Sequence, residues 1–112
     1  MTITTKLLDK IGFLRNSLFI SKDTNNFPDF LGIGAQKSGT TWLYENLKKH
    51  HQLYLPKTKE IHYFDWYFYK SINWYYSYFK GSENHQLKGE LTPCYSTLSE
   101  EKIKFIYKIN PR

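Results

Sequence analysis

The residues with the clearest chemical potential lie in the run from Gly34 to Thr41, where two glycines enclose four residues that include Lys37. Glycines allow backbone N–H groups to approach an anion closely. A helix that starts after such a loop adds its free N–H groups and the positive end of its dipole. The Lys37 ammonium and the hydroxyl groups of Thr40 and Thr41 would complete the cradle. The run therefore predicts a binding site for a phosphate or sulfate group.

The same run departs from the Walker A pattern, in which a lysine follows the second glycine directly. Thr40 occupies that position here, and Lys37 lies inside the loop. An ordinary P-loop ATPase is therefore disfavoured. The plainer interpretation is a glycine-rich turn with one exposed lysine. Anion binding is favoured over it because the glycines, the lysine and the paired threonines coincide between a strand and a helix.

The elements around this loop suit such a site. The apolar run 30–33 predicts a buried strand, and residues 40–50 predict an amphipathic helix. Farther along, residues 61–64 suit a strand or a turn, 73–80 a helix and 89–92 a second short strand. Thr97 and Glu100 have the spacing of a capping box before a last helix. This succession predicts an α/β fold with a Rossmann-like or P-loop-like parallel sheet flanked by helices.

The N-terminal segment shows a helical period of its own. Apolar residues recur at three- and four-residue spacings through residues 3–18, in the stripe Ile3, Leu7, Ile11, Leu14 and Leu18. A basic amphipathic helix of this kind can lie on a membrane, but such stripes more often dock on their own domain. We expect residues 1–26 to be this helix and a polar linker, and residues 27–112 to be the domain.

Composition limits the class of protein. Hydrophobic residues make up 40% and aromatic residues 19% of the 112 residues, which predicts one globular domain. The net charge of +6 favours an anionic partner, although it does not by itself indicate nucleic acid. The single cysteine, Cys94, forms no intrachain disulfide and fits the cytoplasm. His50 and His51 are adjacent, His62 and His85 stand alone, and the sequence has no Cys/His cluster, so no metal site is predicted. No apolar run predicts a spanning helix.

The aromatic residues between 63 and 78 could stack on a sugar or a nucleobase, although for any single ring a core position is the expectation. This set comprises Tyr63, Phe64, Trp66, Tyr67, Trp74, Tyr75 and Tyr78.

From about Phe30 to Arg112 the chain resembles the sulfotransferases that use 3'-phosphoadenosine 5'-phosphosulfate (PAPS), in particular the branch of heparan sulfate and other carbohydrate sulfotransferases. The strongest block is Ile33-Gly34-Ala35-Gln36-Lys37-Ser38-Gly39-Thr40-Thr41-Trp42, which is similar to the loop of that family for the 5'-phosphosulfate. Supporting blocks are 59–65, Trp74-Tyr75 with Phe79, and 89–95.

The resemblance implies a role for particular residues. PAPS would be held by Gln36, Lys37, Ser38, Gly39, Thr40, Thr41 and Trp42. Lys37 would stabilise the charge that develops on the leaving phosphate. Glu60 would be the catalytic base and His62 the fallback base, while Glu90 is equally a paired strand-end carboxylate or an acceptor contact. Leu91 stands where several glycosaminoglycan-specific members have a lysine. No metal is expected.

The resemblance also implies that the residues for the 3'-phosphate and the adenine follow later in the family than Arg112. The chain is therefore expected to correspond to an N-terminal portion that could self-associate through its exposed sheet. The acceptor would be a hydroxyl or amine of a carbohydrate-like molecule. Two alternatives stay open, a P-loop nucleotide kinase or NTPase fragment, which would need Mg²⁺, and a non-catalytic basic module that binds anions.

Overall fold

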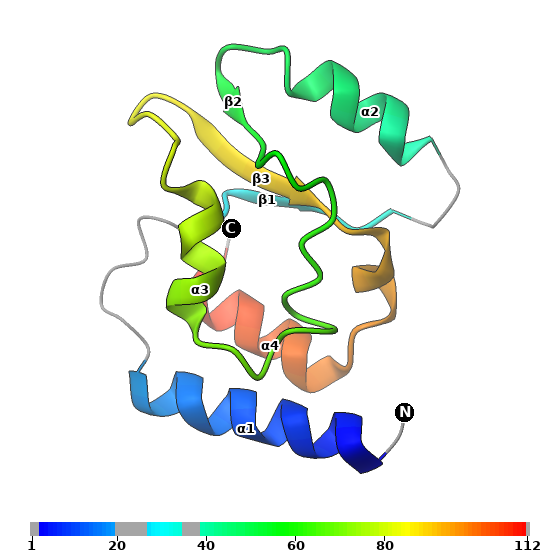
Figure 1. Ribbon diagram of the computed structural model, residues 1–112, viewed down its shortest axis with the longest axis vertical. Coiled ribbons are helices and arrows are strands. Elements are labelled where there is room, and N and C mark those ends of the chain that lie inside the picture. Colours follow the sequence, from blue (N-terminus) through cyan, green and yellow to red (C-terminus); the bar gives the residue numbers. More distant parts are fainter. Residues whose placement is uncertain (1–2, 20–26, 35–38, 112) are drawn as a thin grey trace.

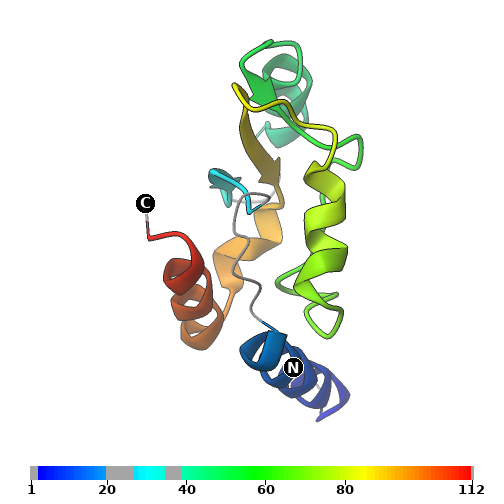
Figure 2. The ribbon, with the colours of Figure 1, turned by 90° about the vertical axis from the view of Figure 1, so that its left-hand side faces the viewer.

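The computed structural model describes residues 3–19, 27–34 and 39–111, without the side chains of 3–5 and 17–19. Its helices are α1 (Ile3–Phe19), α2 (Thr40–Leu47), α3 (Ile72–Tyr76) and α4 (Glu100–Ile109). Its strands are β1 (Phe30–Gly32), β2 (Leu53–Tyr54) and β3 (Leu87–Leu91). Two short 3₁₀ helices, η1 (Ser77–Phe79) and η2 (Pro93–Thr97), follow α3 and β3. Helices α1 and α2 lie at opposite ends of the longest axis (Figure 1 and Figure 2).

The described strands form a parallel sheet in the order β1-β3-β2. Phe30 pairs with Gly89 and Gly32 with Leu91, so β1 and β3 end at the same edge. Ile33 and Gly34 follow β1 beyond this carboxyl edge, and α2 begins at Thr40. Ligands of open α/β sheets bind at this edge. The predicted α/β fold with a parallel sheet and flanking helices is confirmed.

Two glycines let β1 and β3 approach closely enough to pair. A Cβ on Gly89 would lie 2.1 Å from the Phe30 ring, and a Cβ on Gly32 would lie 2.0 Å from Leu91 Cδ2. Either contact is far inside the normal separation of carbon atoms. The Thr92 N–H then donates to the Gly32 carbonyl at 3.0 Å, which extends the pairing beyond the last strand residue. The start of the Gly34 loop is thereby held beside residues 91–92.

Aromatic rings form most of the core next to this sheet. Its fully buried members include Tyr63, Phe64, Phe68, Tyr75, Phe79 and Tyr95. Many of these rings meet edge to face, for example Phe64 on Tyr75 with centroids 5.1 Å apart, an arrangement that adds to the free energy of burial. The expected core position is confirmed for most of the predicted aromatic set, but Trp66 and Tyr67 are exposed.

Helix α1 docks on the domain, but through a different face from the predicted one. Leu7, Ile11 and Leu14 are exposed, so the prediction that the apolar stripe makes the contact is wrong. The buried face instead carries Asn16, whose amide donates to the Tyr63 hydroxyl at 3.1 Å and accepts from the Ile72 N–H at 3.2 Å. Specific hydrogen bonds thus override the hydrophobic period on this helix.

Two further contacts explain the choice of face. Asp9 pairs with the buried Lys102 of α4 at 2.9 Å, and the Phe13 ring packs edge to face on Phe68 with centroids 4.8 Å apart. A Cβ on Gly12 would lie 2.1 Å from the Phe68 carbonyl oxygen, so the helix backbone itself touches the domain. Within the described residues, no helix combines the length and apolar character that crossing a membrane requires.

Several local predictions need correction. The last helix is capped by Ser99, whose hydroxyl accepts from the Lys102 N–H at 3.3 Å, and not by Thr97, which donates to the Cys94 carbonyl inside η2. Of the two alternatives predicted for residues 61–64, the structure shows the turn and not the strand, because the N–H groups of Trp66 and Tyr67 both bond to the His62 carbonyl. The predicted 73–80 helix tightens to 3₁₀ geometry after Tyr76.

Candidate active site

The predicted anion site lies at the N-terminus of α2. Gly39 caps it with φ 84°, a left-handed conformation that side chains beyond glycine rarely adopt, and its carbonyl accepts from the Leu43 N–H. Thr40, Thr41 and Trp42 form the first turn. Gln36, Lys37 and Ser38, also predicted to bind the donor, lie outside the described residues together with Ala35. The binding roles of all these residues remain predictions.

Lys59 brings a second positive group to this helix end. Its Nζ donates to Thr41 Oγ1 at 2.9 Å and lies 3.3 Å from Thr40 Oγ1. A lysine at a helix N-terminus opposes the helix dipole, and the fully described first turn of α2 holds no acidic side chain to compensate. The Lys59 ammonium and the positive end of the α2 dipole lie together, and this arrangement favours the binding of an anion on their solvent side. This role of Lys59 was not predicted from the sequence. Its position directly before the candidate base Glu60 was the signal that could have indicated it.

Tyr44 fixes the distance between α2 and the segment that carries Lys59. Its buried ring is part of a small core with Leu55 and Leu91, and its hydroxyl is 2.6 Å from the Pro56 carbonyl and 3.1 Å from that of Lys57. Lys57, whose carbonyl bonds to Tyr44 of α2, is two residues before Lys59. It holds the lysine within reach of the threonine hydroxyls.

Glu60, His62 and Asp65 follow Lys59 and form a short polar row. His62 Nδ1 lies 2.9 Å from Asp65 Oδ2, and its Nε2 lies 3.6 Å from Glu60 Oε1. The His62 ring stacks on Trp66 with centroids 3.5 Å apart, and His62 has a positive φ of 57°. The His62 side chain is 8% exposed, whereas that of Glu60 is 37% exposed. Glu60 is thus the member of the pair that an external hydroxyl reaches more readily.

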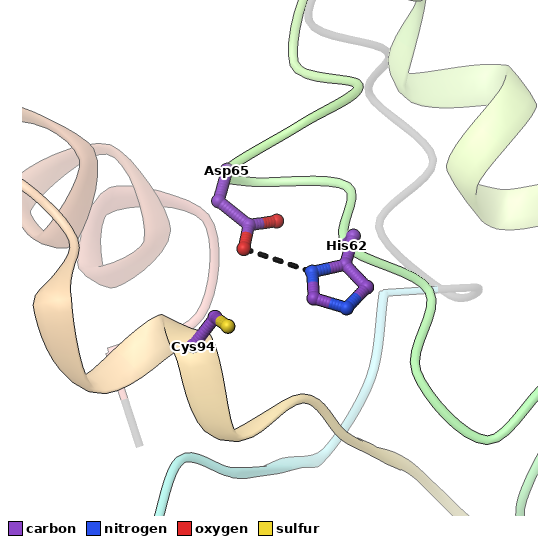
Figure 3. A group of neighbouring side chains, drawn as sticks. All are labelled: His62, Asp65 and Cys94. Atoms are coloured by element: carbon purple, nitrogen blue, oxygen red, sulfur yellow. Dashed lines mark hydrogen bonds and ion pairs between the residues drawn. The ribbon is translucent and has the colours of Figure 1, made fainter. Parts of the chain in front are cut away.

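Sequence reasoning did not single out Asp65 or assign Cys94 a role at this site. The turn at 62–66 brings Asp65 back over His62, and η2 places Cys94 beside both, as Figure 3 shows. The i, i+3 spacing of His62 and Asp65 was a signal for the first. Cys94 stands 29 positions beyond Asp65. The proximity of Cys94 to His62 and Asp65 therefore results from the fold, and local sequence spacing could not have predicted it.

Glu90, predicted as an acceptor contact, lies in the core with 1% of its surface exposed. The hydroxyl of Tyr75 donates to Oε2, that of Tyr95 donates to Oε2 at 3.1 Å, and that of Thr92 donates to Oε1 at 2.7 Å. Burial raises the pKa of the Glu90 carboxyl, and these hydroxyl groups oppose that rise. An acceptor contact at Glu90 stays a prediction, whereas its bonds to protein hydroxyl groups are evident.

The Glu90 cluster supports the polar row from behind. The Tyr95 hydroxyl, which donates to Glu90, accepts from the Tyr63 N–H at 2.9 Å. Tyr63 directly follows His62, so the Tyr95 hydroxyl connects the buried carboxyl through two hydrogen bonds to the backbone next to His62. Burial also raises the pKa of the Tyr95 hydroxyl, which therefore remains a neutral donor. We infer that the cluster fixes the turn in which His62 and Asp65 meet.

A parallel sheet whose carboxyl edge leads to a positively charged helix end, beside a carboxylate and an imidazole, defines a domain suited to transferring an anionic group. The chain belongs to the sulfotransferase domain family, which it matches over residues 27–111. This confirms the resemblance found in the sequence blocks. The match begins after the predicted linker, although the division of the chain at residue 26 stays a prediction.

The chain is also similar to the membrane-associated sulfotransferase kil1 of Dictyostelium discoideum, with 45% identity over 71 residues. The alignment covers 61% of this chain and 15% of that protein. The chain therefore spans only a small part of the length of this relative. Membrane association is a description of the relative, and the cytoplasmic location expected from the sequence stays a prediction.

Proposed function

We propose that the protein transfers a sulfuryl group from PAPS to a hydroxyl or amine of an acceptor, with a carbohydrate as the acceptor class. The observation that carries this proposal is the contact of Lys59 with Thr40 and Thr41 at the N-terminus of α2. It joins a site for a donor anion to the segment that holds the candidate base. Membership in the sulfotransferase domain family favours this reaction over transfer by a nucleotide kinase.

The residues at this helix end fit a phosphosulfate group. The Lys59 ammonium, the threonine hydroxyls and the free N–H groups of the first turn offer donors and positive charge at one place. Lys37 would add a second ammonium. When bound, PAPS supplies an activated sulfuryl group on a phosphate leaving group. The positive groups of the chain would bind this charge and stabilise its growth on the phosphate.

Glu60 would accept the proton that the acceptor hydroxyl loses as its oxygen forms the new bond to sulfur. Its exposure, greater than that of His62, supports this assignment. His62, held by Asp65 on one nitrogen and stacked on Trp66, would position Glu60 through its other nitrogen. His62 remains the fallback base. The acceptor itself is proposed from the sequence resemblance to the carbohydrate branch.

The test is transfer of radiolabelled sulfate from PAPS to a panel of glycan acceptors, with the product of the full reading frame. Glu60→Gln keeps the size of the side chain but removes its basic oxygen. We expect turnover to fall by roughly 10² to 10⁴ while the affinity for PAPS is unchanged. Glu45→Gln, on the exposed surface of α2, is the matched control and should retain turnover.

Two outcomes would contradict the proposal. Full transfer by Glu60→Gln, with loss of transfer in His62→Gln, would reassign the base to His62. Absence of transfer to every acceptor by the unmodified protein, with donor binding intact, would refute the carbohydrate acceptor class.

A further inference from the structure

Two side chains of the polar row and one from η2 form a group of three that bind metals well. One ligand atom each from His62, Asp65 and Cys94 lies within 4.8 Å of the others, and Figure 3 shows the three side chains grouped between η2 and the 62–66 turn. His62 is buried, and the other two are partly buried. Imidazole, carboxylate and thiolate are the three ligand types that Zn²⁺ takes in proteins.

The distances require only small adjustments for a metal. Zn–N and Zn–O bonds of about 2.0 to 2.1 Å and a Zn–S bond of about 2.3 Å place tetrahedral ligand atoms about 3.3 to 3.6 Å apart. His62 Nδ1 and Asp65 Oδ2, now 2.9 Å apart, would separate by about half an ångström. The sulfur of Cys94 starts within 4.8 Å of the other two ligand atoms and would approach them by about 1 Å. Rotation about side-chain bonds provides such shifts.

A hydrogen bond already holds the two ligand-bearing segments together. The Tyr95 hydroxyl accepts the N–H of Tyr63, and these two residues directly follow Cys94 and His62 in the chain. On the other side, the Trp66 and Tyr67 N–H groups bond to the His62 carbonyl and fix the turn that returns Asp65. Binding therefore requires no change in the fold, which lowers its entropic cost.

The outer contact of His62 also suits a metal ligand. Metal-bound histidines usually donate their second ring N–H to a carboxylate, which fixes the ring orientation. When Nδ1 faces the metal, Nε2 faces Glu60 Oε1, at 3.6 Å in this structure. The stack of the imidazole on Trp66 fixes the plane of the ring. Glu60 would thus act as the orienting carboxylate, a contact separate from its proposed role as base.

We propose that His62 Nδ1, an Asp65 oxygen and Cys94 Sγ form a binding site for Zn²⁺ or a divalent ion of similar softness, with a water molecule as the fourth ligand. The metal takes the place of the proton between His62 Nδ1 and Asp65. In the neutral imidazole this proton moves to Nε2, where the ring N–H faces Glu60, and the thiol proton of Cys94 is released to solvent. The aspartate and the thiolate together balance the charge of the ion. This inference does not depend on sulfuryl transfer, and with the metal on Nδ1 and a proton on Nε2, Glu60 would be the base of the pair.

The test is a Co²⁺ titration of the full chain followed by displacement with Zn²⁺. Tetrahedral Co²⁺ is visible by its d–d absorption, and a bound thiolate adds a sulfur-to-metal charge-transfer band in the near ultraviolet. We expect both at one equivalent of Co²⁺. Cys94→Ser should abolish the charge-transfer band. Cys94→Ser and Asp65→Asn should each weaken Zn²⁺ binding by more than the roughly 10-fold to 100-fold that loss of an outer contact costs.

The control is the double variant His50→Gln/His51→Gln, which removes an exposed, stacked pair of imidazoles that could bind cobalt by itself. It should keep the charge-transfer band and the affinity. Circular dichroism of each variant confirms that it is folded. The proposal is overturned if folded wild-type chain shows no sulfur-to-cobalt band, if Asp65→Asn retains full affinity, or if only the His50/His51 variant loses binding.

Discussion

Replacing Tyr95 by phenylalanine tests whether the Glu90 cluster supports the polar row. The substitution keeps the buried ring but removes the oxygen that accepts the Tyr63 N–H at 2.9 Å and donates to Glu90 at 3.1 Å. Tyr75→Phe is the matched comparison, because the Tyr75 hydroxyl donates to the same carboxyl oxygen and its ring is equally buried. Both variants thus lose one hydroxyl bond to Glu90. Tyr95→Phe alone also leaves a buried backbone N–H without its acceptor.

The expected difference follows from that N–H. A hydroxyl bond to a carboxyl contributes about 1 to 2 kcal/mol, and this loss is common to both variants. An unsatisfied buried donor costs about 1 to 3 kcal/mol more. Tyr95→Phe should therefore lower the free energy of unfolding by roughly 2 to 5 kcal/mol, and Tyr75→Phe by roughly 1 to 2 kcal/mol. Urea denaturation followed by circular dichroism measures both. Equal losses would refute the inference that Tyr95 anchors the turn.

Three other predictions follow from described contacts. Burial raises the pKa of Glu90 above its ordinary 4.5, so the folded chain holds this proton more tightly than the unfolded chain and loses stability as pH rises through and above that value. Glu90→Gln cannot ionise, so its stability deficit in urea denaturation should be larger near pH 4.5 than near neutrality, and a constant deficit would contradict the assignment. Lys59→Met should weaken binding of adenosine 3',5'-bisphosphate by about 10-fold to 100-fold in calorimetry, whereas Lys48→Met, on the exposed side of α2, should not. Asn16→Ala should cost about 2 to 3 kcal/mol of unfolding free energy, against less than about 0.5 for the exposed Leu7→Ala; comparable losses would mean that α1 docks through its apolar stripe after all.

The first strand and the helix after Gly39 could be predicted because their patterns are local. An apolar run that ends in glycine and a helical period after it need no tertiary information. The docking face of α1 could not be predicted in this way. Its contact depends on Asn16, which finds partners in Tyr63 and Ile72, and on the close approach at Gly12. The spacing of apolar residues predicts neither the hydrogen bonds of Asn16 nor the close approach at Gly12.

The same distinction applies to the site. Glu60 and His62 were found because they are close in the sequence and in a block typical of a family. Lys59 reaches Thr41 across 18 positions, and Cys94 joins Asp65 across 29 positions. Glu90 differs from these residues, because it was considered for an acceptor contact but is buried. Hydroxyl groups of the protein satisfy its carboxyl there. Only the packed core reveals which of these pairs form.

The central claim is that the N-terminus of α2, with Lys59, binds the phosphosulfate end of the donor. The most direct measurement is an NMR titration of the ¹⁵N-labelled chain with adenosine 3',5'-bisphosphate, which carries the 5'-phosphate of that donor. The largest amide shifts are predicted at residues 39–42 and at Lys59, and Lys59→Met should reduce them while Lys48→Met leaves them intact. Shifts confined to other parts of the chain, or tighter binding of ATP that requires Mg²⁺, would contradict the claim.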